Sequence, residues 1–201
     1  SFVSRGMVKR LIASLVIASP VTVEAIKNNE IEAYFLPQGI IATSYREQAA
    51  SSPGKITKIG LNTVIDPRMS GGKVNDITHD DLVSLIEINN EEYLHYDFPK
   101  IDVALLRGTY ADENGNIYMT HESHLGEGFS AASAAKQNGG KVIVQVKEVI
   151  EKGSFNPRDV FIPSELVDYV VVNKNPKFHK QVIQTYYDPA LSGHHRILNS
   201  K

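Results

Sequence analysis

Two kinds of hydrophobic pattern alternate along the chain, and they predict alternating helices and strands. Helices are expected at 19–30, 40–50 and 129–137. Ser19 suits the N-cap and Pro20 suits the first helical position, so the first helix should begin there. The third helix is rich in small residues and should stop at the Asn-Gly-Gly sequence that follows it.

Short apolar runs between the helices predict β-strands. The run "IDVALLRG" at 101–108 is continuously apolar, which is typical of a strand that is covered on both faces. "LVDYVVV" at 166–172 predicts another buried strand. The segments 55–65 and 82–96 alternate in the manner of antiparallel strands, with Asn89-Asn90 as a turn in the second.

Apolar strands joined to helices by short loops predict an α/β fold with a mainly parallel central sheet flanked by helices. The strands expected in this sheet are 31–36, 101–107, 141–146 and 167–172. A small antiparallel hairpin region is expected within 56–97. The chain has 201 residues, 42% of them hydrophobic, which suits one globular domain or at most two small ones.

Composition then excludes several kinds of site. The formal net charge is −2 and the isoelectric point is near 6.4, so no electrostatic footprint for nucleic acid or an anionic membrane is present. The sequence has no cysteine, which excludes disulfides, zinc–thiolate sites, iron–sulfur clusters and thiol nucleophiles within it. Its seven histidines form no H-x-x-x-H or H-E-x-x-H pair, and no metal site is expected.

The segment "RGMVKRLIASLVIASP" is similar to a short secretory signal, because basic residues precede an apolar run at 11–18 and small residues follow. The run is near the short end for such signals and is far too short to span a bilayer. A buried element followed by the helix start at Ser19 is the simpler interpretation, and it favours a cytoplasmic location.

Three further motifs are weak. "GEGFSA" at 126–131 has the glycine pattern of a dinucleotide site but no strand directly before it, so a loop entering a helix is expected. "SGGK" at 70–73 lacks the spacing and the hydroxyl of a P-loop and predicts a turn. "HESH" at 121–124 offers at most two metal ligands on a loop, and no G-x-S-x-G sequence carries a serine nucleophile.

The stretch "FLPQG" presents a glutamine at a strand end. The strand ends at Leu36, Pro37 stiffens the exit, and Gly39 opens the next helix. Gln38 should therefore lie at the carboxyl edge of a parallel sheet, where open α/β folds bind their ligands. Its amide can donate to a developing oxyanion, aided by the positive end of the helix. The alternative is a polar loop residue.

The stretch "ADENGN" at 111–116 places Glu113 beside Asn114-Gly115, so this glutamate is a candidate nucleophile, a cation ligand or part of a hairpin tip. Asn-Gly is the favoured tip of a two-residue hairpin, because both positions accept positive φ. The further acidic residues that a calcium loop needs are missing. A turn with a solvated Glu113 is expected.

Several ordered segments resemble family I coenzyme A transferases, most closely the acetate/propionate type with both halves on one polypeptide. The matching segments are "LPQG", "GLNTVIDPR…GGKVND", "IDVALLRGTYADENGN", "AAKQNGGKVIVQVKEV", "GSFNPRDVFIP…LVDYVVV" and "YDPALSG". The resemblance implies the α/β fold shared with glucosamine-phosphate and ribose-phosphate isomerases. It also implies a domain at 1–193, truncated at both ends, followed by a polar tail at 194–201.

The resemblance implies transfer of coenzyme A from a short-chain acyl-CoA to a free carboxylic acid. In the family a glutamate carboxylate attacks the acyl-CoA, and the thiolate cleaves the resulting anhydride to give a glutamyl–CoA thioester. Coenzyme A is then a substrate, and no cofactor is expected. The implied partners are the C-terminal half of the same enzyme and further copies in a homo-oligomer, with no nucleic acid and no membrane.

The family's nucleophile lies in a Glu-x-Gly context of the second half, whereas this chain resembles the first half only. Glu113 matches a first-half turn, so no nucleophile is expected in this chain and the chain by itself should be inactive. Gln38 matches a first-half glutamine that stabilises an oxyanion or carboxylate, and Gly39 would allow close backbone approach. Asn62 and Asp66 lie in matching segments without an assigned role.

Two other classes of function stay open from the sequence. A non-catalytic ligand-binding or regulatory domain can have the same fold. A sugar-phosphate isomerase can as well, although the sequence has no convincing phosphate-binding constellation. Finding a second half with a Glu-x-Gly sequence downstream in the same reading frame would distinguish the transferase hypothesis from that of a non-catalytic domain.

Overall fold

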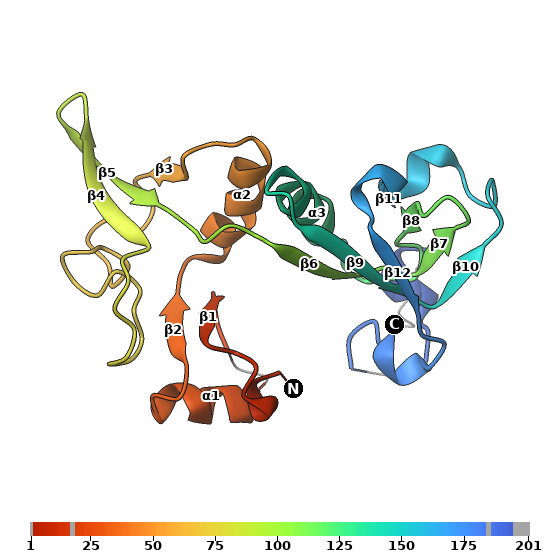
Figure 1. Ribbon diagram of the computed structural model, residues 1–201, viewed down its shortest axis with the longest axis horizontal. Helices are drawn as coiled ribbons and strands as arrows, with labels where there is room; N and C mark the ends of the chain where they lie inside the picture. Colours follow the sequence, from red (N-terminus) through yellow and green to blue (C-terminus); the bar gives the residue numbers. More distant parts are fainter. Residues whose placement is uncertain (1, 17–18, 184–185, 195–201) are drawn as a thin grey trace, which may run out of the picture. The chain divides into compact units, whose positions relative to one another are not determined.

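The computed structural model describes residues 2–16, 19–183 and 186–194. The chain forms two compact units, Ser1–Pro99 and Lys100–Lys201, and each has its own hydrophobic core (Figure 1). The polar tail expected at 194–201 lies outside the described residues except for its first position, and the domain expected at 1–193 stays a prediction.

The first unit combines a parallel strand pair with an antiparallel hairpin. Its helices and strands are β1 (Arg10–Ala13), α1 (Pro20–Lys27), β2 (Glu32–Phe35), α2 (Gln38–Ala49), β3 (Lys55–Thr57), β4 (Val83–Ile88) and β5 (Glu91–Tyr96). β1 and β2 run parallel, and α1 makes the crossover between them. The predicted helix start is confirmed, because Pro20 is the first helical residue and Ser19 is the N-cap. The Ser19 hydroxyl lies 2.7 Å from that of Thr22 instead of accepting from a backbone amide.

The predicted antiparallel hairpin is confirmed in β4 and β5. The strands pair along their whole length, and Asn89 and Asn90 both have positive φ, 54° and 63°. Positive φ at both central residues is the type I′ turn that matches the twist of a hairpin. β3 pairs with the other edge of β5, and the fully buried Leu94 and Tyr96 of β5 pack in one core with Tyr34 of β2.

Residues 58–72 form a loop, so the prediction that the strand pattern of 55–65 continues beyond Thr57 is wrong. Asn62 has a φ of 59°, which is incompatible with a strand. The Asp66 carboxylate accepts the amides of Asn62 at 2.9 Å and Arg68 at 3.0 Å and pairs with the Arg68 guanidinium at 2.8 Å. The Arg68 side chain, followed by the Asn62 amide, holds the pKa of this 1% exposed carboxyl well below its usual range. Asp66 and Asn62 therefore stabilise the loop.

The second unit is built on a parallel sheet. Its helix and strands are β6 (Val103–Arg107), β7 (Tyr110–Asp112), β8 (Ile117–Tyr118), α3 (Gly128–Gln137), β9 (Lys141–Val146), β10 (Glu148–Ile150), β11 (Val160–Ile162) and β12 (Tyr169–Val172). The parallel sheet has the order β12-β9-β6, and the second sheet has the order β10-β7-β8-β11 (Figure 1). Ala132 and Ala135 of α3 pack against Val142 and Val144 of β9, where small side chains let the helix lie close to the sheet.

The α/β class with parallel sheets is confirmed, but the expectation that one sheet joins 31–36 to the other three segments is wrong. β2 pairs with β1, whereas β6, β9 and β12 form a separate sheet. The second edge of β2 is already occupied, because Phe35 donates to the Gly72 carbonyl at 2.9 Å and Val74 donates to that of Ala33 at 3.0 Å.

The predictions that 101–108 is covered on both faces and that 166–172 is a buried strand are also wrong for the described residues. Leu105 of β6 is 62% exposed, and Val171 of the edge strand β12 is 47% exposed. A parallel sheet needs a helix on each face to be fully buried. The described part of the second unit contains one α-helix, α3, which covers the face that carries Val142 and Val144.

Asp168 fixes the start of β12 to β9. Its carboxylate accepts the Val142 amide at 2.9 Å, and its own amide donates to the Val142 carbonyl at 3.0 Å. Lys136 of α3 lies 3.1 Å and Lys141 of β9 lies 3.2 Å from the same carboxylate. The Val142 amide and the Lys136 ammonium lower the pKa of Asp168 to about 2.

This lowered pKa predicts a specific acid sensitivity. A carboxyl whose pKa falls on folding stabilises the native state above its unfolded pKa of about 3.9, and the contribution is lost as the pH falls toward the folded value. The stability difference between the wild type and Asp168→Asn should be constant above about pH 5 and should shrink from about pH 4 to about pH 2. Urea denaturation at a series of pH values measures it.

The exposed Asp159→Asn variant is the matched control in the same unit, and it should change stability little. A wild-type advantage over Asp168→Asn that stays unchanged down to the lowest pH would show that the charge of Asp168 contributes nothing.

Candidate functional site

Gln38 lies where the parallel pair of the first unit ends. β2 stops at Phe35, and the next residue, Leu36, donates its amide to the Ala13 carbonyl at the end of β1. Pro37 has a φ of −57° and a ψ of 131°, which turns the chain away from the pair and into α2. Gln38 is the first residue of α2 and is exposed. The expected position at the carboxyl edge of a parallel pair is therefore found.

The amino-terminal end of α2 offers hydrogen-bond donors. The first bonds of the helix are donated by Ile40 and Ile41 to the Pro37 carbonyl, so the amides of Gln38 and Gly39 precede the helical ladder. The helix dipole adds partial positive charge at this end. A side chain at Gly39 would meet no heavy atom within 4 Å, so the surface there is open. These groups can stabilise a carboxylate or a developing oxyanion.

An apolar cavity of about 380 Å³ lies at the same end of β1 and β2. It is lined by Ser14, Leu15, Val16, Val23, Ile26, Lys27, Phe35 and Val74. Ser14 follows β1 and Phe35 is the last residue of β2, while Val23 and Ile26 come from α1. A cavity with this lining can accommodate a hydrocarbon chain.

Glu113 lies on a turn between β7 and β8, as predicted, and its side chain is exposed. The turn differs from the expected two-residue type, because only Gly115 has positive φ, at 93°. The buried Asp112 carboxylate explains the difference, since it accepts the amides of Asn114 at 3.0 Å and Asn116 at 2.9 Å. Glu113 contributes one weak contact by accepting the Lys152 amide at 3.3 Å.

Asp112 is the residue that fixes the conformation of this turn. Its carboxylate also accepts the Asn116 side-chain amide at 2.9 Å and the Tyr118 hydroxyl at 3.1 Å. Burial raises the pKa of Asp112, but the hydrogen bonds from Asn116, Tyr118 and Asn114 outweigh it, so its pKa is lowered overall. A carboxylate with four donors stays ionised and rigid.

The sequence interpretation missed a polar cluster at the carboxyl ends of β9 and β12. Lys147 directly follows β9, and its ammonium lies 3.1 Å from Nδ1 of His121. The His121 ring stacks on Tyr187 with centroids 4.0 Å apart, and the Lys147 ammonium lies 5.7 Å from the Tyr187 centroid. Burial lowers the pKa of both Lys147 and His121. The short "HESH" motif was the only sequence signal, and it suggested a metal rather than a lysine partner.

Gln181 holds this cluster together. It is buried, and its side-chain amide donates to the carbonyls of His121 at 2.9 Å and Asp188 at 3.0 Å. Its side-chain oxygen accepts the Asp188 amide at 2.7 Å, and its own carbonyl accepts the Ser123 hydroxyl at 2.6 Å. All polar atoms of the side chain are thus used in positioning the segment that follows β12.

No set of three or more metal-ligating side chains comes together within the ranges that the structure describes. In the same ranges, none of the helices is long and apolar enough to cross a membrane.

The sequence matches the family model named coenzyme A transferase over residues 1–173. It is 50% identical over 173 residues to caffeate CoA-transferase of Acetobacterium woodii, covering 86% of this chain and 33% of that protein. It is 39% identical over 168 residues to acetate CoA-transferase YdiF of Escherichia coli K12, covering 84% of this chain and 32% of that protein. The crystal structure of the acyl-CoA transferase YdiF apoenzyme from Escherichia coli O157:H7 matches with a TM-score of 0.89 and 34% identity, over 96% of this chain and 37% of that one. The chain spans about a third of the length of these relatives.

The turn at 111–116 gives a test on two neighbouring acidic residues. Asp112→Ala should lower the free energy of unfolding by about 1–3 kcal/mol, because it leaves buried donors such as the Tyr118 hydroxyl unpaired. Glu113→Ala removes an exposed carboxylate and should stay within about 0.5 kcal/mol of the wild type. Urea denaturation of both variants measures the contrast, and equal losses would show that the turn is not organised by Asp112.

Proposed function

The chain belongs to the coenzyme A transferase family, and we propose that it forms the first half of an enzyme that moves coenzyme A between a short-chain acyl-CoA and a free carboxylate. The match of the family model to residues 1–173 carries this proposal. The relatives are named for caffeate and acetate, which are both carboxylates. The cytoplasmic location, the homo-oligomer and the lack of a cofactor stay predictions from the sequence.

We propose a covalent mechanism in which the nucleophile comes from outside these 201 residues. A glutamate carboxylate of the second half attacks the acyl-CoA carbonyl, and the thiolate of coenzyme A leaves as a mixed anhydride forms. The thiolate then attacks the glutamyl carbonyl, which releases the carboxylic acid and forms a glutamyl–CoA thioester. The acceptor acid reverses the two steps. Glu113 takes no part, because it lies on an exposed turn.

The role proposed for Gln38 is to stabilise the oxyanion that forms at each of these attacks. Its exposed side chain and the first amides of α2 lie at one end of the parallel pair β1–β2. Preorganised amide donors lower the energy of a tetrahedral oxyanion more than that of the planar carbonyl. The apolar cavity at the same end of the pair has room for the hydrocarbon part of a short-chain acyl group.

The proposal predicts that the chain alone is catalytically silent. The described residues place no carboxylate in a closed cleft that a substrate can enter, and water would destroy an exposed anhydride before the thiolate returned. The chain should show no borohydride-sensitive coenzyme A adduct by intact mass after incubation with propionyl-CoA. Addition of the separately produced second half should give both the adduct and turnover.

A complete coenzyme A transferase treated in parallel controls for detection of the adduct. A stoichiometric adduct that peptide mapping locates within this chain would overturn the half-enzyme assignment. A folded pair of halves that binds acyl-CoA without any turnover would instead support a non-catalytic ligand-binding domain.

The role of Gln38 predicts a kinetic defect in the complete enzyme. Gln38→Ala should lower kcat by roughly 10²–10³, the usual cost of losing one oxyanion donor. Gln48→Ala, near the other end of the same helix, is the matched control and should stay within about twofold of the wild type. Steady-state rates with propionyl-CoA and acetate measure both variants, and near-normal turnover of Gln38→Ala would leave it a surface residue without a catalytic role.

A further inference from the structure

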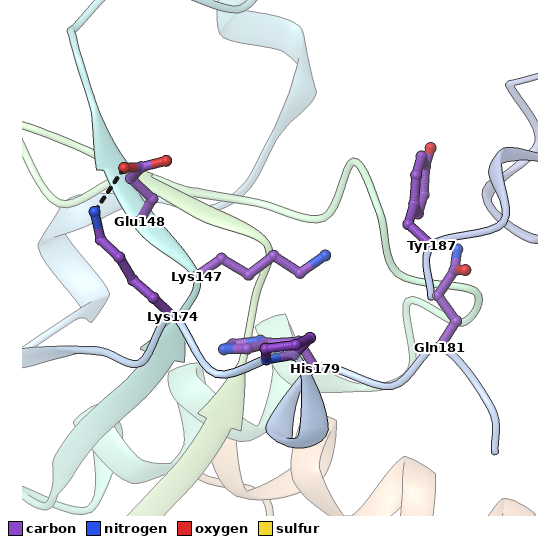
Figure 2. A pocket seen from close by; sticks show the side chains of 7 residues that line it. Lys147, Glu148, Lys174, His179, Gln181 and Tyr187 are labelled. Carbon is purple, nitrogen blue, oxygen red and sulfur yellow. Dashed lines mark hydrogen bonds and ion pairs between the residues drawn. The ribbon is translucent and has the colours of Figure 1, made fainter. Parts of the chain in front are cut away.

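Two histidines lie where the segment after β12, residues 174–183, meets the rest of its unit, and the proposed transfer reaction uses neither of them. His179 belongs to the segment and is 6% exposed. His121 is half-buried, and its carbonyl accepts the side-chain amide of Gln181 at 2.9 Å. Figure 2 shows His179 and Gln181 around one pocket of about 250 Å³, together with Lys147. Both histidines therefore belong to the contact that holds the segment closed.

The surroundings of His179 accept only a neutral ring. Its Nε2 lies 2.5 Å from the Asn173 carbonyl, so Nε2 carries the proton and donates to it. Nδ1 is buried and has no hydrogen-bond partner among the described residues. A second proton on the ring would have to sit on Nδ1, where no acceptor is in reach, and a buried charge without a partner is costly. Burial accordingly lowers the pKa of His179 more than the bond to Asn173 raises it.

His121 is held neutral by a different contact. Its Nδ1 lies 3.1 Å from the Lys147 ammonium, which can only donate, so Nδ1 must be the acceptor. A proton on Nδ1 would bring two donors and two positive charges together and would break this contact. The ring also stacks on Tyr187, with centroids 4.0 Å apart. Burial, followed by the charge of Lys147, lowers the pKa of His121.

The other charged and titratable groups nearby leave no carboxylate to accept an additional proton's charge. Within the described ranges, the carboxylates near the two rings are each in an ion pair already: Glu122 with Arg107, and Glu148 with Lys174. Figure 2 marks the second pair with a dashed line. Around His121 the remaining groups are uncharged or basic, namely Tyr110 at 5.3 Å, Tyr187 at 4.0 Å and His194 at 6.4 Å between ring centroids.

We propose that the segment after β12 is an acid-sensitive closure, which stays packed on its unit while His121 and His179 are neutral and opens as the two rings take up protons. In the open segment both rings reach water and titrate with the ordinary histidine pKa of about 6.5. The closed state is therefore fully favoured above about pH 6.5 and becomes less favourable as the pH falls below it. Opening uncovers Lys147, whose pocket is lined by His179 and Gln181. The proposal concerns the second unit alone and does not depend on the transfer reaction.

Hydrogen exchange of the whole chain, read by mass spectrometry and corrected for the intrinsic rates, measures the opening constant of residues 174–183. Between pH 7.5 and pH 5.5 this constant should rise by up to about tenfold for each histidine, or up to about 100-fold for both. A constant that does not change with pH would overturn the proposal. So would one equal to that of β9 at both pH values, because the opening would then be global.

Variants assign the rise to the two rings. His121→Phe keeps a ring against Tyr187, and His179→Phe keeps a ring in the buried position, but neither can take up a proton. Each should reduce the rise by up to about tenfold, and the double variant should nearly abolish it. His124→Phe, at an exposed histidine close to His121 in sequence, is the matched control and should keep the full rise. A rise that persists in the double variant would refute the assignment.

A titration of the wild type decides the matter if the variants do not fold. The ring protons of the histidines, followed by NMR from pH 8 to pH 5, give the pKa of each residue. His121 and His179 should both titrate at a lower pH than the exposed His124. If either of them titrates at or above the pH found for His124, the proposed closure is wrong.

Discussion

A parallel pair of strands cannot be closed by a tight turn, because the chain must return to the starting end of the first strand before the second begins. In this protein α1 makes that return between β1 and β2, and α3 lies in the return from β6 to β9. The crossovers leave the carboxyl ends of the strands at one edge, where the chain turns outward in loops. Gln38 follows β2, Lys147 follows β9 and His179 lies in the segment after β12. The candidate residues of both units are therefore positioned by the same constraint.

The carboxylates that fix the loops act through backbone amides. Asp66, Asp112 and Asp168 each accept at least one amide from a segment that would otherwise leave its donors unpaired. The pKa of each is lowered, so all three stay ionised at neutral pH. Loops positioned in this way are rigid enough to carry functional side chains without regular secondary structure. The stability of these loops therefore depends on the charge of a carboxylate, unlike that of loops without one.

Local sequence signals were sufficient for several element boundaries and for the position of Gln38. Three features depend only on residues adjacent in sequence: the helix start at Pro20, the hairpin turn at Asn89-Asn90 and the strand end before Gln38. The structure has each of them where it was expected. The prediction of a single central sheet was wrong because residues 72–74, which are distant in sequence, bond to the second edge of β2. Apolar content likewise could not show that β12 lies at the edge of its sheet.

The polar cluster shows a different limit of sequence interpretation. Lys147 and Gln181 lie 26 and 60 positions after His121 in the sequence, and no motif joins the three residues. Burial gives these side chains their properties, since it lowers the pKa of both Lys147 and His121. A sequence shows which residues can ionise, but their surroundings decide how they behave.

Gln181 joins the segment after β12 to the rest of its unit, beside the bonds made by Asn173, Lys174 and Phe178. Its side chain binds three backbone groups, and its carbonyl accepts the Ser123 hydroxyl. Because these bonds share one residue, we expect them to break together when this part of the chain opens locally, at a free energy below that of global unfolding. We expect the amide hydrogens of residues 174–183 to exchange with solvent sooner than those of β9, and a protease to cleave there while the sheet stays folded.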